Sequence, residues 1–132
     1  MTDEMKTKVN YWLDLAQYDL ETAEVMLNGK RYLYVGFMCH QAIEKALKAC
    51  IWALKGLEPE YTHALARLLR SSGLTEQVPK HLTDIIDVLE PLNIEARYPT
   101  DKDKLMRSLS HGRSEEILAQ TKELYGWIKK KL

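Results

Sequence analysis

A strip of polar residues is the first feature of this sequence that could do chemistry. It consists of His40, Gln41, Glu44, Lys45 and Lys48, several of which are spaced four residues apart. In a helix that spacing places side chains next to one another on one face. The strip is therefore either a solvated face with ordinary ion pairs or the lining of a groove or self-association surface. One His–Glu pair supplies too few ligands for a metal site.

The second candidate is the segment Glu95-Ala96-Arg97-Tyr98-Pro99. An arginine beside an aromatic residue, on a loop anchored by proline, can contact a phosphate and stack on a base. The structural alternative is that Arg97 pairs with a helix-end carbonyl or with Glu95 while Tyr98 packs on the protein. Because proline disfavours the helical conformation of the residue before it, we expect residues 94–99 to be extended.

Two further candidates contain histidine. Arg107 and His111 could stabilise phosphoryl charge and transfer a proton, as RNA cleavage without a metal requires. The two side chains would meet only if residues 107–111 are helical; otherwise the segment is a polar connector. His63 follows Thr62, a predicted N-cap, and could serve the helix start or packing instead of chemistry.

Composition limits the function classes. The chain has 132 residues, 45% of them hydrophobic, and a formal net charge of zero. We expect one domain, residues 1–132, and the balanced charge argues against a strongly basic nucleic-acid binder. No apolar run approaches the ~20 residues of a membrane span, and the polar start lacks the features of a signal peptide, so we expect a cytoplasmic protein without membrane contact. Cys39 and Cys50 would lie ~16 Å apart in one helix, too far for a disulfide.

The elements that must position these residues are helices, because apolar residues recur at spacings of three and four and nowhere alternate as in strands. We predict an all-α, up-and-down antiparallel bundle of four main helices and one short helix. The second helix is apolar nearly all round, which indicates a central position. The predicted helices cover 8–27, 32–54 and 63–71, a fourth from Pro79 to just before Pro91, and a fifth capped by Ser114. Residues 93–113 are predicted to be irregular, with one short turn from Thr100 through Leu109.

Several of these segments together resemble the HEPN family, the helical domain of higher eukaryotes and prokaryotes with proposed nucleotide binding. The resemblance spans nearly the whole chain. It is carried by the segments 12–23 (Trp-x-x-x-Ala-x-x-Asp-Leu-x-x-Ala), 39–49 (Cys-His-Gln-Ala-Ile-Glu-Lys-Ala-Leu-Lys-Ala), 62–65 (Thr-His-x-Leu) and 94–99 (Ile-Glu-Ala-Arg-Tyr-Pro).

The resemblance implies a helical bundle that dimerises or forms a higher homo-oligomer. It also implies a partner, a small nucleotidyltransferase of the minimal type, often in a toxin–antitoxin pair. Some family members are metal-free ribonucleases with four to six residues between Arg and His, whereas Arg107 and His111 are separated by three. The sequence therefore looks more like the branch that carries Glu-Ala-Arg-Tyr-Pro and lacks catalysis.

The leading hypothesis is a non-enzymatic module that self-associates, pairs with a nucleotidyltransferase and holds a nucleotide, with no cofactor and no metal. From their chemistry, the nucleotide-binding candidates are Arg97 and Tyr98 first, then His40, Lys45 and Lys48. One alternative is a metal-independent ribonuclease toxin that cleaves RNA with Arg107 and His111. A second alternative is a structural oligomerisation domain without a ligand.

Overall fold

The protein is an all-α bundle. The computed structural model describes residues 1–132 and contains six α-helices, two single-turn 3₁₀ helices and no strand. The elements are α1 (Asp3–Asn28), α2 (Tyr32–Lys55), α3 (Leu65–Ser72), α4 (Lys80–Leu89), η1 (Glu90–Leu92), η2 (Ile94–Ala96), α5 (Pro99–Ser108) and α6 (His111–Lys129). The all-α prediction is confirmed, but the predicted count of four main helices and one short one is not.

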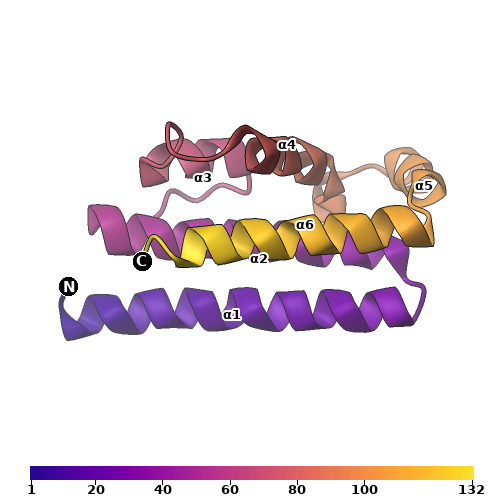
Figure 1. The fold of residues 1–132 in the computed structure, drawn as a ribbon. Coiled ribbons are helices and arrows are strands. Elements are labelled where there is room, and N and C mark those ends of the chain that lie inside the picture. The colour runs from indigo at the N-terminus through magenta and orange to yellow at the C-terminus, as the bar shows by residue number, and fades with distance from the viewer.

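The helices form three layers, with α2 and α6 in the middle (Figure 1). Helix α1 runs antiparallel to α2 along one side, and the short helices α3 and α4 cover the opposite side. Helix α5 closes one end of the bundle, away from both chain termini. None of these helices combines the length and the apolar character that crossing a membrane would require.

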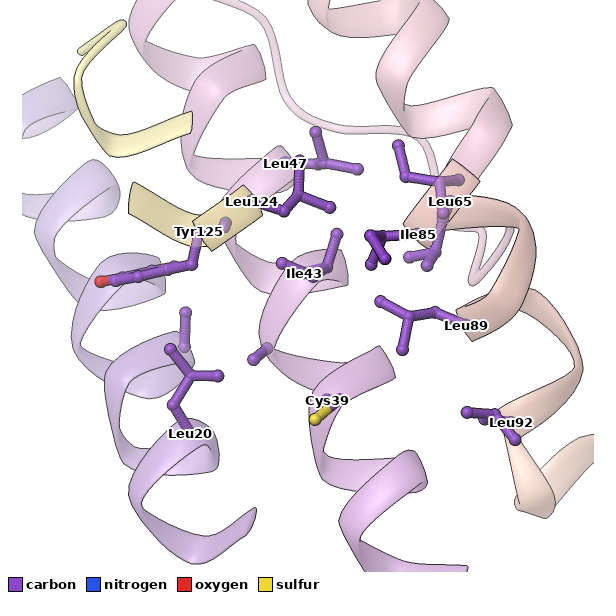
Figure 2. Packing of buried hydrophobic residues seen from close by; sticks show 14 of the residues in the cluster. Leu20, Cys39, Ile43, Leu47, Leu65, Ile85, Leu89, Leu92, Leu124 and Tyr125 are labelled. Carbon is purple, nitrogen blue, oxygen red and sulfur yellow. The ribbon is translucent and has the colours of Figure 1, made fainter. Parts of the chain in front are cut away.

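The core is built around α2, as its nearly all-apolar surface predicts. Figure 2 shows Ile43 and Leu47 of α2 among side chains from neighbouring helices, including Leu124 of α6 and Leu89 of α4. All four are fully buried. Cys39 and Cys50 are buried and unpaired, and burial raises the pKa of each thiol to about 12.

Helices α1 and α6 begin at other residues than predicted, because a different hydroxyl residue caps each of them. Helix α1 begins at Asp3, five residues before the predicted start, because the Thr2 hydroxyl accepts a hydrogen bond from the Met5 amide at 3.2 Å. Helix α6 is capped in the same way by Ser110, whose hydroxyl accepts from the Arg113 amide at 3.1 Å. The prediction of Ser114 as its cap is wrong: Ser114 is a buried residue inside the helix.

The short helices α3 and α4 start later than predicted. Helix α3 begins at Leu65 and not at His63, and Thr62 instead accepts from the Ala64 amide in the preceding loop at 3.2 Å. Helix α4 begins at Lys80, so that Pro79 is its N-cap and not its first helical residue.

The region predicted to be irregular contains more helix than expected. Pro99 occupies the first position of α5, a ten-residue helix, because proline has the dihedral angle of a first turn and needs no amide donor there. Residues Ile94–Ala96 form η2, so only Arg97 and Tyr98 are extended. The extended prediction therefore holds only for the two residues directly before the proline.

The central position of α2 gives a testable stability difference. Leu47→Ala should lower the free energy of unfolding by ~2–5 kcal/mol, because Leu47 is fully buried and its removal leaves a cavity. Leu54→Ala is the matched control on the same helix; Leu54 is 42% exposed, and its loss should cost within ~0.5 kcal/mol. Chemical denaturation measures both, and equal losses would contradict the central placement of Leu47.

Candidate functional site

The polar strip of α2 is largely buried. His40 is 1% exposed, Glu44 3% and Lys48 8%. The interpretation of the strip as a solvated face is therefore wrong for these three residues, whereas Gln41 and Lys45 are half-buried. Since an unpaired charge inside a protein is costly, each of these groups must be compensated by a partner.

Glu44 is the centre of a network of hydrogen bonds that includes residues of the polar strip. One oxygen of its carboxylate accepts a hydrogen bond from Lys48 Nζ at 3.1 Å. The other accepts from Nδ1 of His63, a residue of the loop before α3, at 3.0 Å. The Glu44 carboxylate thus ties α2 to a loop that the sequence places 19 positions further along. Of the four candidate groups, His63 is the one the structure joins directly to the strip.

His40 lies between two carboxylates. Its Nδ1 is 4.0 Å from Glu44 Oε1 and its Nε2 is 4.0 Å from Glu90 Oε1. Burial lowers the pKa of His40 below its ordinary 6.5, and the two carboxylates oppose part of this shift. Glu90 also accepts a hydrogen bond from the Leu65 amide at 2.8 Å, which satisfies a free amide at the start of α3.

Arg97 has a structural partner. Its guanidinium donates to the carbonyl of Pro91 at 3.1 Å and to the carbonyl of Glu90 at 3.3 Å. It therefore binds the first two carbonyls of the η1 turn, directly after α4, as the structural alternative predicts. Tyr98 does not pack on the bundle and is 79% exposed. Lys45, another predicted phosphate contact, is paired with Asp19 of α1.

Arg107 and His111 do not share a helix. Arg107 lies in the last turn of α5, which ends at Ser108, and His111 is the first residue of α6. The juxtaposition expected for a continuous helix is therefore absent. The His111 ring instead contacts α2, with Nδ1 2.9 Å from the Tyr32 hydroxyl.

A large pocket opens beside Lys48, between the first half of α1, the end of α2 and the following loop. It has a volume of about 510 Å³. We call it the aromatic pocket, and its lining consists of Thr7, Lys8, Tyr11, Trp12, Lys48, Trp52, Glu58, Pro59, Glu60 and Tyr61. Two lysines face indole rings: Lys8 Nζ lies 4.2 Å from the Trp52 ring centre, and Lys48 Nζ lies 5.2 Å from that of Trp12.

Of the five predicted nucleotide-binding residues, Lys48 alone lines the aromatic pocket. The aromatic residues of this pocket were not predicted from the sequence, although the register of the first two helices indicates that they lie together. In an antiparallel hairpin with its turn near Gly29, residues whose numbers sum to about 60 lie opposite each other, and this register pairs Lys8 with Trp52 and Trp12 with Lys48.

A smaller polar pocket lies on the other side of Glu44. Its volume is about 220 Å³, and it is lined by Gln41, His63, Asn93, Glu95 and Ala96. The carboxamide oxygen of Asn93 is buried without a hydrogen-bond partner. No group of three or more His, Cys, Asp or Glu side chains is arranged to hold a metal ion.

The family of the chain follows from a comparison with models of known domain families. The model of the HEPN domain matches residues 9–132. The chain belongs to the HEPN domain family.

Two solved structures share this HEPN fold. The crystal structure of TT1696 from Thermus thermophilus superposes with a TM-score of 0.80 at 27% sequence identity, over 95% of this chain and 98% of that one. ST0689, an archaeal HEPN homologue, superposes with a TM-score of 0.71 at 20% identity, over 93% of this chain and 96% of that one. No curated protein matches the sequence.

The buried His40 should make the stability of this HEPN domain pH-dependent. The folded state holds the ring neutral, whereas the unfolded chain binds a proton near pH 6.5, so acidification favours unfolding. We expect the free energy of unfolding to fall as the pH drops through about 6.5, with a slope of at most ~1.4 kcal/mol per pH unit from this group.

Denaturation between about pH 7.5 and 5.5 tests this, with His40→Gln as the variant. The variant should show a flatter dependence than the parent over that range. His81→Gln is the control, because the His81 side chain is 64% exposed and its contact with Glu123 lies at the surface, where such a pair contributes little to stability. An unchanged slope in His40→Gln would contradict the role of His40.

Proposed function

We propose that this HEPN protein is a non-enzymatic binding module that self-associates, pairs with a minimal nucleotidyltransferase and holds a nucleotide. One observation supports the nucleotide: the aromatic pocket combines indole and phenol rings with two lysine side chains, and of its two glutamates Glu60 is already paired with Arg67. We place the nucleotide in this pocket and not at the Arg97–Tyr98 segment, because Arg97 already binds backbone carbonyls.

The chemistry of the pocket suits a planar base that carries phosphate. Bases stack on aromatic side chains, and each such contact contributes ~1–3 kcal/mol. The Trp12 and Trp52 rings are half-buried and held by their helices, while Tyr61 is 92% exposed and able to cover a ligand. Lys8 supplies a cation at the rim, and the volume of about 510 Å³ is in the range of ~300–1,000 Å³ usual for ligand sites.

The ribonuclease alternative has less support. It needs an arginine that stabilises phosphoryl charge beside a histidine that transfers a proton. Arg107 and His111 lie on different helices, and His111 is held by Tyr32 of α2. The purified protein is therefore not expected to cleave RNA in the presence of EDTA.

Two exposed tyrosines distinguish the two nucleotide sites. Tyr61→Ala should weaken nucleotide binding by at least ~1 kcal/mol through lost stacking, as measured by calorimetry with a series of nucleoside phosphates. Tyr98→Ala is the matched control, because Tyr98 is also highly exposed but does not line the aromatic pocket. Neither change removes a buried side chain, so both variants should fold.

The opposite result, with binding lost in Tyr98→Ala and kept in Tyr61→Ala, would show that the nucleotide binds at the Arg97–Tyr98 segment. Absence of binding by the parent protein to every nucleotide tested would contradict the nucleotide role altogether. Thermal melting gives an independent reading, since a ligand at ~100 times its dissociation constant adds ~2.7 kcal/mol of stability. No shift would favour the structural oligomerisation domain.

The partner is tested separately by native purification from the source cells and mass spectrometry. A small nucleotidyltransferase should copurify in stoichiometric amount. Recovery of the HEPN chain alone, under conditions that preserve its own self-association, would contradict the pairing.

A further inference from the structure

The small polar pocket beside Glu44 is a binding site distinct from the aromatic pocket, with which it shares no residue. It has a volume of about 220 Å³ and is formed by α2, the loop before α3 and the turn around η2. Its lining consists of Gln41, His63, Asn93, Glu95 and Ala96. The volume is below the ~300–1,000 Å³ usual for whole ligands, so the pocket suits a side chain or a head group.

Asn93 is the residue of this pocket that the fold leaves unexplained. It is 8% exposed, and its carboxamide oxygen is buried without a hydrogen-bond partner. Asn93 directly precedes the η2 turn, but its side chain does not cap that turn. Buried acceptors without a partner are costly and rare in folded proteins. A hydrogen-bond donor from outside the chain would therefore be stabilising at this place.

Two other side chains of the pocket also present acceptors. The Glu44 carboxylate can only accept hydrogen bonds, so His63 donates to it through Nδ1, at 3.0 Å, and Nε2 of the neutral ring is left as an acceptor. The amide nitrogen of Gln41 lies 3.4 Å from Nδ1 of His40. This contact uses the donor of the Gln41 carboxamide and leaves its oxygen for the pocket.

The charge of the pocket is negative. Glu95 is exposed at the rim, and its neighbour Arg97 donates to backbone carbonyls and not to the Glu95 carboxylate. No lysine or arginine lines the pocket, so nothing in it would compensate a phosphate or another anion. A ligand that fits must instead be a cation whose polar atoms are all donors.

The number of acceptors favours one kind of cation. The pocket offers two carboxylate oxygens, one oxygen from each of two carboxamides and one imidazole nitrogen. A guanidinium group carries five N–H donors in a planar fork and has no acceptor, whereas an ammonium group carries three donors. The guanidinium group therefore satisfies more of these atoms at once.

We propose that the polar pocket binds a guanidinium group, which arrives either as an arginine side chain of a partner protein or as a free small molecule. Its positive charge compensates Glu95, and its N–H groups donate to the carboxamide oxygens of Asn93 and Gln41. The site depends neither on the nucleotide nor on the self-association of the proposed function, so its test can fail independently of them.

Nuclear magnetic resonance titration of the isotope-labelled protein tests the proposal. The probes are N-acetylarginine amide and agmatine, with N-acetylcitrulline amide as the uncharged control of nearly the same shape. The arginine probe should shift the side-chain amide signals of Asn93 and Gln41 and bind at least ~10-fold more tightly than the citrulline compound, because hydrogen bonds from a charged donor are stronger. Tighter binding of N-acetylarginine amide would identify an arginine side chain as the ligand, and tighter binding of agmatine a free small molecule.

Two variants separate binding from folding. Glu95→Gln removes the charge of an exposed residue and should weaken the arginine probe at least ~10-fold. Glu76→Gln is the matched control, because Glu76 is also exposed but does not line the pocket. Asn93→Ala should weaken binding without lowering the denaturation midpoint of the ligand-free protein, since the lost side chain makes no hydrogen bond in the fold through its oxygen.

Three results would overturn the proposal. The first is equal binding of the arginine and citrulline compounds, or the absence of signal changes at the pocket. The second is an unchanged affinity in Glu95→Gln. The third is a lowered midpoint with unchanged affinity in Asn93→Ala, which would show that Asn93 has a purely structural role.

Discussion

The polar strip of α2 depends on one interaction, the pairing of the buried Glu44 carboxylate. This carboxylate is buried in the middle of α2 and is compensated by Lys48 on one side and His63 on the other. Breaking a buried ion pair such as Lys48–Glu44 leaves a charge uncompensated inside the protein and costs ~3–5 kcal/mol, whereas the His63 side chain is 52% exposed. The loop before α3 is therefore fixed to α2 by the hydrogen bond between His63 and Glu44.

Most of the fold follows from local patterns in the sequence. The apolar surface of α2 predicts its central position, and Leu47 and Cys50 are indeed fully buried. The helix starts were less predictable because two hydroxyl residues competed for one cap. Ser110 and Ser114 are both suited to begin α6, and the choice of Ser110 adds one turn that brings His111 against Tyr32 of α2. That tertiary contact is invisible to a search for local caps.

The candidate site was predictable only in part. The strip of α2 is visible in the sequence because its members are four residues apart, but two partners of its polar groups, Glu90 and His63, come from distant segments. The partner of Arg97 also could not be predicted from its residue type. Its position before Tyr98-Pro99 suggests a phosphate contact, yet the η1 turn presents two carbonyls to its guanidinium. Residue type gives the chemistry, and the fold decides which partner is within reach.

Lys48 connects the buried network to the aromatic pocket. Its ammonium group lies 3.1 Å from Glu44 and 5.2 Å from the Trp12 ring centre, so its charge is already compensated before any ligand arrives. A phosphate would therefore gain more from Lys8, whose ion pair with Glu4 is exposed and weak at 3.6 Å. In the proposed nucleotide site, Lys48 would orient Trp12 for stacking and would not itself bind the phosphate. Because Glu44 holds Lys48 in place, the shape of the pocket depends on a carboxylate that does not line it.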